Sequence, residues 1–232
     1  MDVVSLLLAD SRFPGGSHIH SGGLEEVVAR RLVTTERDLP AFLHGRLWTA
    51  GLLAASFAAA SADAAGRAVH GGVQARHWAR LDAEFDARTP SLAQREASRA
   101  QGRGTARAGR TAWPSPVITE LLATTPRPHH PVITGALAGV AGGSPHGAAL
   151  AVAYLAISGP ASAAVRLLGF DPLTVNAMVA GLAPELESVA TRAAAVAGMD
   201  PAELPGPGAP ALDLFAEAHL RQHKKEVRLF AS

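Results

Sequence analysis

The stretch LTVNAMVAGLAPELESVATRAAAVAG, residues 173–198, carries the clearest periodic pattern in the 232-residue chain. Its apolar side chains recur at helical spacing and therefore mark one face of a helix. Asp171 is predicted to cap the start of this helix, and Gly198 to close its end. Pro184 should kink or interrupt the helix, because proline donates no backbone hydrogen bond. The apolar face consists of Val175, Met178, Val179, Leu182, Leu186, Val189, Ala193 and Val196.

Helical patterns continue outward from this stretch, and no useful run alternates between apolar and polar residues as a strand would. The abundance of alanine also favours helix over strand. We therefore predict an all-α fold, with a single helical-bundle-like domain of about ten helices over residues 1–232. Residues 199–210, MDPAELPGPGAP, hold four prolines and predict a linker. Residues 211–232 then form a C-terminal docking helix and tail.

The overall composition excludes several classes of protein. A net charge of +1 favours neither nucleic acid nor an anionic membrane as a partner. The absence of cysteine excludes disulfides, thiolate metal sites and a cysteine nucleophile. It also fits a reducing, cytoplasmic location. Residues 1–12 lack the basic start and the long apolar run of a signal peptide.

One long uncharged stretch, residues 128–165, raises the alternative of a membrane protein. The segment GGSPHG at 142–147 and the pair Gly159-Pro160 are predicted to cut this stretch into short pieces. Its alanine, glycine and serine also make it only mildly apolar. We therefore predict buried helices here rather than a membrane span.

Common catalytic motifs do not fit this sequence. A phosphate-binding loop needs the pattern G-x-x-x-x-G-K-[ST], yet the only lysines are Lys224 and Lys225. The segment GGSHIHSGG does not match the G-x-S-x-G turn of serine hydrolases. We therefore expect no enzymatic activity. An enzyme of another type would need a pocket in which acid and base groups converge.

Two histidine pairs are candidate metal ligands. They are His18 with His20 and the neighbours His129 and His130. Imidazole suits nickel, zinc or copper. However, residues two apart point the same way only in an extended chain, and the helical H-E-x-x-H pattern is absent. The alternative that we favour is that these histidines make hydrogen bonds in loops or at an interface.

The segment SLAQREASRAQGRGTARAGRTA, residues 91–112, is rich in arginine. Arg95, Arg99 and Arg103 recur every four residues, so they share one face of a helix. No aromatic residue lies between them to stack nucleic-acid bases. The face is either solvated or binds another protein through the planar guanidinium groups.

Two terminal segments also indicate contacts. Residues 11–28, SRFPGGSHIHSGGLEEVV, place glycines before a helix, where they allow a backbone to approach closely. We predict that residues 11–25 form a loop for protein contact, which also lines a route for a metal ion; internal packing is the alternative. The ending HKKEVRLFAS, residues 223–232, turns apolar where a free tail is usually polar. It docks either on its own core or in a partner's groove.

Four segments together resemble the UreF family of urease accessory proteins. They span nearly the whole chain in the family's order: LLLADSRFPGGSHIHSGGLE (6–25), REASRAQG (95–102), HHPVITGALAG (129–139) and EVRLFAS (226–232). The chain departs from the family's usual pattern at His18-Ile19-His20-Ser21. It also departs at 167–182, where Gly169-Phe170-Asp171 and Asn176 replace a glutamine-containing form.

The resemblance implies a non-enzymatic, all-α, commonly homodimeric cytoplasmic chaperone. Such a protein binds the accessory protein UreD/UreH and, with it, recruits the GTPase UreG. The resemblance also implies that it regulates GTP hydrolysis by UreG. The assembly inserts nickel into apo-urease, so we expect no resident cofactor but a transient nickel transfer. Alternatives are a histidine-based nickel carrier and an unrelated helical protein-interaction module. The expected partner-binding residues are Phe13, Pro14, Gly15, Gly16, His18, His20, Ser21, Gly22, Gly23, Arg95, Glu96, Ser98, Arg99, Gln101, Arg228, Leu229 and Phe230.

Overall fold

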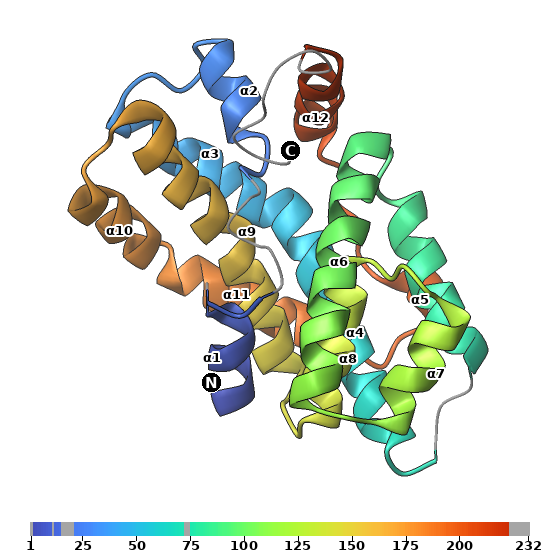
Figure 1. The fold of residues 1–232 in the computed structure, drawn as a ribbon. Helices are drawn as coiled ribbons and strands as arrows, with labels where there is room; N and C mark the ends of the chain where they lie inside the picture. Colours follow the sequence, from blue (N-terminus) through green and yellow to red (C-terminus); the bar gives the residue numbers. More distant parts are fainter. Residues whose placement is uncertain (1, 11, 15–20, 72–74, 223–232) are drawn as a thin grey trace.

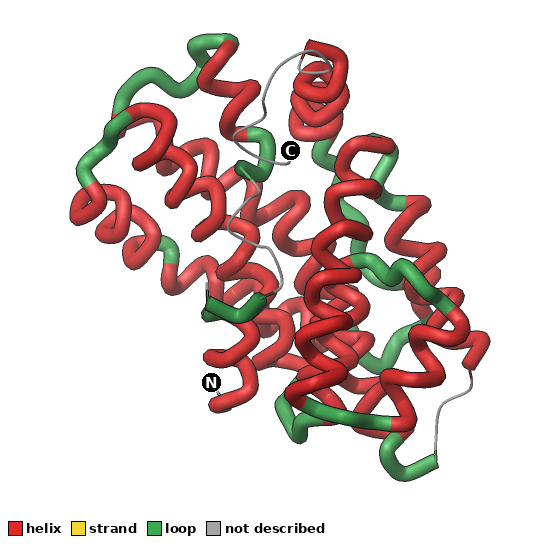
Figure 2. The backbone as a smooth tube through the Cα atoms, viewed as in Figure 1, coloured by secondary structure: helices red, strands yellow, loops and turns green. Residues whose placement is uncertain are grey.

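The computed structural model describes residues 2–10, 12–14, 21–71 and 75–222. This part of the chain contains α-helices and loops but no strand, which confirms the all-α prediction (Figures 1 and 2). The α-helices are α1 (Val3–Ala9), α2 (Leu24–Ala29), α3 (Leu39–Arg46), α4 (Leu52–Ala68), α5 (Ala75–Ala87), α6 (Leu92–Ala112), α7 (Pro116–Thr124), α8 (His130–Val140), α9 (Pro145–Leu168), α10 (Pro172–Gly181), α11 (Ala183–Ala195) and α12 (Pro210–Gln222).

Residues 173–198 contain nearly all of α10 and the whole of α11. Asp171 caps α10, since its carboxylate accepts hydrogen bonds from the backbone N–H groups of Leu173 and Thr174 at 3.3 and 3.0 Å. The predicted interruption by Pro184 is confirmed, because α10 ends before it and Pro184 lies in the first turn of α11. Gly198 does not close the helix, so that prediction is wrong. Instead α11 ends at Ala195, and tight turns satisfy the carbonyls of Ala193, Ala194 and Val196 around its end.

Helix α4 lies between two apolar clusters. One cluster joins α4 to α2, α3, α9, α10 and α11. The other joins α4 to α5, α7 and α8, with the fully buried side chains of Phe57 and Trp78 at its centre. A π-helical turn at Leu47–Gly51 connects α3 to α4 without a break. The two clusters therefore share one helix and form a continuous helical body (Figure 1).

Helix α9 corrects a boundary that the sequence suggested. The pair Gly159-Pro160 does not break it, because α9 continues through both residues as far as Leu168. The segment around Gly142 does separate α8 from α9, as predicted. Helix α9 is long and apolar enough to cross a membrane, and 61% of its most apolar window is buried inside the fold. It therefore occupies the position of a core helix.

The proline-rich segment at 199–210 packs beside α5 over part of its length. Pro201 and Leu204 are buried there. Arg88, which directly follows α5, donates a hydrogen bond to the carbonyl of Ala202 at 2.7 Å. After this segment, α12 lies beside α2 and the start of α6 (Figure 1). The division into a linker followed by a docking helix stays a prediction.

Candidate functional site

Arg46, at the end of α3, connects three parts of the chain. Its Nε donates to the carbonyl of Ala156 at 2.8 Å, and its Nη1 donates to the carbonyl of Gly22 at 2.7 Å. The carbonyl of Ala156 lies four residues before Pro160, which has no N–H to donate. Arg46 therefore supplies the hydrogen bond that Pro160 removes from α9. It also fastens Gly22, in the described end of the glycine segment (residues 15–23), to the same point.

Gly22 is required at this junction for two reasons. Its φ of +61° lies in the left-handed region, which side chains with a Cβ rarely adopt. A Cβ at this position would also lie 2.7 Å from Cζ of Arg46 and 2.8 Å from Cγ of Pro160. The glycine therefore permits both the turn and the close approach to Arg46.

A second polar network holds α6 against α5 and the start of α8. Arg99 on α6 forms ion pairs with Asp82 at 2.9 Å and Asp86 at 3.0 Å. Asp82 also accepts the backbone N–H of His129 at 2.8 Å, and Asp86 meets Nε2 of His129 at 2.7 Å. One arginine thus faces two carboxylates, and both carboxylates reach the same histidine.

Ser98 completes this network and indicates the tautomer of His129. With Nε2–H of His129 donating to Asp86, Nδ1 accepts from the hydroxyl of Ser98 at 3.1 Å. The oxygen of Ser98 in turn accepts the backbone N–H of His130 at 3.2 Å. The hydroxyl therefore bonds both histidines at the first turn of α8.

This network places two carboxylates beside Arg99, and Nε of Arg95 lies 3.7 Å from one of them, Asp86. Burial of the imidazole lowers the pKa of His129, and it outweighs the opposite effect of Asp82. Burial alone would raise the pKa of Asp86, but the hydrogen bond from His129 and the charge of Arg99 outweigh burial together. The pKa of Asp86 is therefore below its ordinary value. At neutral pH the network therefore holds a neutral histidine, two carboxylates and an arginine.

Gly102 allows α6 to reach this position. A Cβ on Gly102 would lie 2.0 Å from the carbonyl oxygen of Pro128, the residue before His129. Because a backbone atom cannot move aside as a side chain can, only glycine fits at this crossing. The contact sets the distance between α6 and the start of α8, and hence the reach of Ser98.

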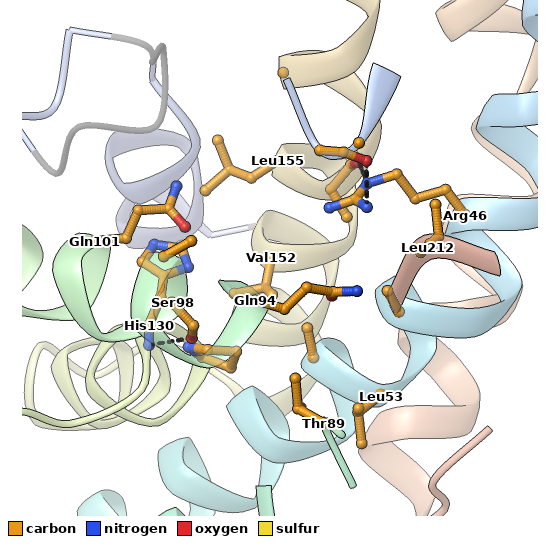
Figure 3. Close-up of a pocket in the computed structure, with 18 of the residues that line it drawn as sticks. Arg46, Leu53, Thr89, Gln94, Ser98, Gln101, His130, Val152, Leu155 and Leu212 are labelled. Atoms are coloured by element: carbon orange, nitrogen blue, oxygen red, sulfur yellow. Dashed lines mark hydrogen bonds between the residues drawn. The ribbon is translucent and has the colours of Figure 1, made fainter. Parts of the chain in front are cut away.

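A cavity of about 150 Å³ lies between these two networks (Figure 3). Gly22 and Arg46 border it on one side, while Ser98, Gln101 and His130 border it on the other. Apolar side chains of α4, α9 and α12 form much of the remaining wall. The arrangement is a concave, mainly apolar space with a few polar groups, which is the usual form of a binding site.

Helix α12 closes this region at the start of α6. Ser91 caps α6 by accepting the N–H of Gln94 at 3.2 Å. Two carboxylates of α12 reach the same end: Glu217 accepts from the hydroxyl of Ser91 at 2.8 Å, and Asp213 accepts from the side chain of Gln94 at 3.1 Å. Negative groups are favourable here, because the first N–H groups of a helix carry partial positive charge.

The fold brings together several residues that the sequence singled out. Gly22, Gly23, Ser98, Gln101 and His130 all line the cavity, although they come from three separate stretches. The sequence resemblance had grouped these stretches only by their order along the chain. Their partner-binding role stays a prediction.

The other predicted contact residues lie in different environments. Arg95 bonds the carbonyls of Thr89 and Pro90 at 2.8 and 2.9 Å, so it is engaged within the chain, as Arg99 is. Glu96 is exposed on α6. Before the glycine segment, Phe13 stacks on Trp113 with ring centroids 6.1 Å apart.

Two further predicted residues, Pro14 and Ser21, are exposed and buried, respectively. The rest lie outside the described residues, and their assignment stays a prediction. They are Gly15, Gly16, His18, His20, Arg228, Leu229 and Phe230.

Of the four candidate metal ligands, His129 and His130 lie within the described residues. No group of three His, Asp or Glu side chains within the described ranges is arranged to hold a metal ion. Both ring nitrogens of His129 are in hydrogen bonds, whereas His130 borders the cavity. The metal role of these two histidines, and of His18 and His20, stays a prediction.

Sequence reasoning missed Arg46, Asp82 and Asp86. A signal for Arg46 did exist, because a proline inside an apolar helix leaves the carbonyl four residues earlier without its helical donor. That signal identifies Ala156 as an acceptor. It does not identify which residue of another helix supplies the N–H.

Comparisons with known proteins identify the family of this chain. The family model UreF matches residues 33–183. The urease accessory protein UreF of Mycobacterium sp. strain JLS is 47% identical over 227 residues, which cover 98% of this chain and 97% of that protein. Its counterpart in Mycolicibacterium vanbaalenii is 45% identical over 98% of this chain and 97% of its own. For Mycobacterium tuberculosis strain H37Rv the identity is 44%, over 93% of both chains.

The family match covers the helices from α3 to the start of α11, and the relatives extend it to nearly the whole chain. The chain belongs to the UreF family of urease accessory proteins.

Proposed function

We propose that this protein is a non-enzymatic chaperone of urease maturation. It forms a complex with the UreD/UreH accessory protein, recruits the GTPase UreG and influences its GTP hydrolysis. The assembly delivers nickel to apo-urease in the cytoplasm, and this chain takes part as a homodimer. Nickel is the cargo of the assembly and contacts this chain at most in transit.

The observation that carries the proposal is the near full-length relationship to urease accessory proteins, at 44–47% identity. Two features of the chain support it. The sequence lacks a phosphate-binding loop, so nucleotide chemistry would belong to a partner. Gly22-Gly23 and residues of the REASRAQG segment also border one cavity, where a partner could meet both.

The proposed contact surface combines this region with exposed groups of α6. Glu96 and Arg103 are exposed on that helix, whereas Arg95 and Arg99 are engaged in bonds within the chain. Substituting Arg99 would therefore disturb the fold before it disturbs a partner. Glu96 and Arg103 are the residues with which a contact can be tested separately from stability.

Co-purification tests the proposal. Tagged chain is mixed with UreD/UreH and UreG, with and without nickel and GTP, and the retained proteins are measured. We expect retention of UreD/UreH alone and of UreG only when UreD/UreH is present. Failure to retain UreD/UreH under all conditions would overturn the proposal, as would appreciable GTP hydrolysis by the purified chain alone.

Two variants locate the contact. A chain ending at Gln222 keeps α12 and removes the tail with Arg228, Leu229 and Phe230. We expect it to lose partner retention, because apolar anchors dominate such interfaces. The matched control is Leu214→Ala, which truncates an exposed apolar residue on α12 itself. Equal retention by the shortened and full chains would remove the tail from the proposed surface.

A further inference from the structure

The cavity between Gly22-Gly23 and α6 carries a charge that its described lining residues do not balance. Among those described residues Arg46 is the one with a permanent charge, and none is Asp or Glu. Much of the remaining wall is hydrocarbon, including Leu53, Val152 and Leu155, and the neutral amide of Gln94 also borders the space (Figure 3). A lone cation in apolar surroundings favours an anionic ligand.

Arg46 retains donors for such a ligand. A guanidinium has five N–H donors, and the described part of the chain engages Nε and Nη1 with the carbonyls of Ala156 and Gly22. Both acceptors are neutral, so the positive charge itself is not compensated. Burial accordingly lowers the pKa of Arg46 to about 10. A carboxylate at the remaining N–H groups would reverse this effect.

We propose that the cavity binds a small apolar monocarboxylate, with its carboxylate on the guanidinium of Arg46 and its hydrocarbon body against Leu53, Val152 and Leu155. One guanidinium balances one negative charge, which favours a monoanion over a phosphate dianion. The volume of about 150 Å³ is similar to that of an engineered protein cavity that binds benzene. The ligand is therefore of the size of one substituted ring or a short alkyl chain.

This inference is independent of the proposed role in urease maturation. It concerns the isolated chain and needs neither nickel nor another protein. Binding to the cavity also does not require Arg46 to leave Ala156 or Gly22, since these two bonds use Nε and Nη1 and leave Nη2 for the ligand.

Benzoate and benzamide are the probes, because they have nearly the same shape and differ in charge. Their binding to the purified full chain is measured by calorimetry at pH 7.5. We expect saturable binding of benzoate with a Kd of roughly 1 mM or lower, and binding of benzamide about tenfold weaker. Equal binding of the two compounds, or no saturable binding of benzoate, would overturn the proposal.

Cavity-filling variants locate the binding without removing Arg46, whose two backbone bonds support the fold. Ala54→Leu on α4 and Ala97→Leu on α6 each place extra atoms in the cavity from opposite walls. We expect each variant that keeps its helical circular-dichroism spectrum to bind benzoate at least about tenfold more weakly. Unchanged affinity in a folded variant would contradict the cavity as the site.

Arg46→Lys tests the geometry of the charge. Lysine keeps one positive charge but loses the planar fork that pairs with a carboxylate, so benzoate should bind several-fold more weakly while still exceeding benzamide. Chloride is the last competitor. If chloride at the same concentration displaces benzoate, the site binds simple anions and the assignment to an apolar carboxylate is wrong.

Discussion

Arg99 and Arg46 perform similar tasks in surroundings of opposite electrical character. Arg99 holds α6 to α5 and α8 through two carboxylates, Asp82 and Asp86, at 2.9 and 3.0 Å. Arg46 holds the glycine segment to α9 through two backbone carbonyls, and no carboxylate of the described residues lies within ion-pair distance of it. One arginine is neutralised by its neighbours, while the other keeps its charge.

The difference separates a structural junction from a candidate binding site. Removing one partner of a buried ion pair costs much free energy, because the other charge is left unpaired. The Arg99 junction should therefore be rigid and costly to disturb. A buried charge without a counter-ion is destabilising in itself, and proteins retain such groups where they act. The comparison predicts large stability effects around Arg99 and smaller ones around Arg46.

The largest effect should follow from Gly102→Ala, which forces α6 away from the start of α8. The added Cβ would lie 2.0 Å from the carbonyl oxygen of Pro128, so the backbone must shift and the bonds of Ser98 to His129 and His130 must lengthen. We expect the free energy of unfolding to fall by about 3 kcal/mol or more. Urea denaturation followed by circular dichroism measures it.

Gly66→Ala is the matched control on α4, because a Cβ there meets no atom within 4 Å. This variant should be as stable as the parent or more stable by up to about 1 kcal/mol, since alanine is the better helix former. Similar losses in the two variants would show that helix propensity, rather than the crossing at Pro128, decides the result.

The next effect in size should be that of Arg99→Met, which leaves Asp82 without its ion pair. The side chain of Asp82 is 8% exposed and that of Arg99 is 21% exposed, so the pair is only partly screened by water. We expect a loss of about 2–3 kcal/mol in the free energy of unfolding, measured by urea denaturation. The double variant Arg99→Met/Asp82→Asn should recover part of the loss, because the unpaired charge is then gone. A double variant less stable by the sum of both single losses would argue against the pairing.

Sequence patterns determined the helical character of the chain and several of its boundaries. The apolar periodicity around Pro184 and the cap at Asp171 were enough to predict α10 and α11, since both features act within a few residues. The outcome at Pro160 shows where local reasoning ends. A proline in a helix costs a hydrogen bond, but Arg46, distant in sequence, replaces that bond and lets α9 continue.

The candidate site was predictable only in pieces for the same reason. The stretches holding Gly22, Ser98 and His130 stood out by their composition and by the family resemblance. Nothing local to them indicated that they border one cavity. Asp82 and Asp86 resemble any surface carboxylates of an amphipathic helix, because their importance comes from the partners that the fold supplies.

A smaller loss should result from Gly22→Ala on the Arg46 side of the comparison. Alanine is strained at a φ of +61°, and its Cβ would displace the guanidinium of Arg46. We expect the free energy of unfolding to fall by about 2 kcal/mol. Gly142→Ala is the control, because Gly142 also has a positive φ, of +81°, but a Cβ there meets no atom within 4 Å.

The control should lose only about 1 kcal/mol, which is the cost of the left-handed backbone alone. The remaining difference between the two variants, measured by urea denaturation, then belongs to the contact with Arg46. Equal losses at the two glycines would mean that the junction tolerates a shifted guanidinium. Arg46 would then differ from Arg99 in the rigidity of its surroundings as well as in its charge balance.

The smallest expected effect is a pH dependence of stability caused by His129, which belongs to the network around Arg99. The folded-state pKa of His129 is lowered by burial, so the unfolded chain takes up a proton more readily than the folded one. The stabilising contribution is therefore present above the unfolded pKa and is lost as the pH falls below it. We expect the urea midpoint to decrease between pH 7.5 and pH 5.5, and the decrease to be smaller in His129→Gln.

His77, whose pKa is also lowered by burial, contributes a background slope that the comparison of the two proteins removes. Asp86 does not interfere in this range, because its lowered pKa places its titration at more acidic pH. Equal slopes for the parent and His129→Gln would mean that protonated His129 is accommodated between Asp86 and Ser98. Arg99 would then share its two carboxylates with a protonated histidine.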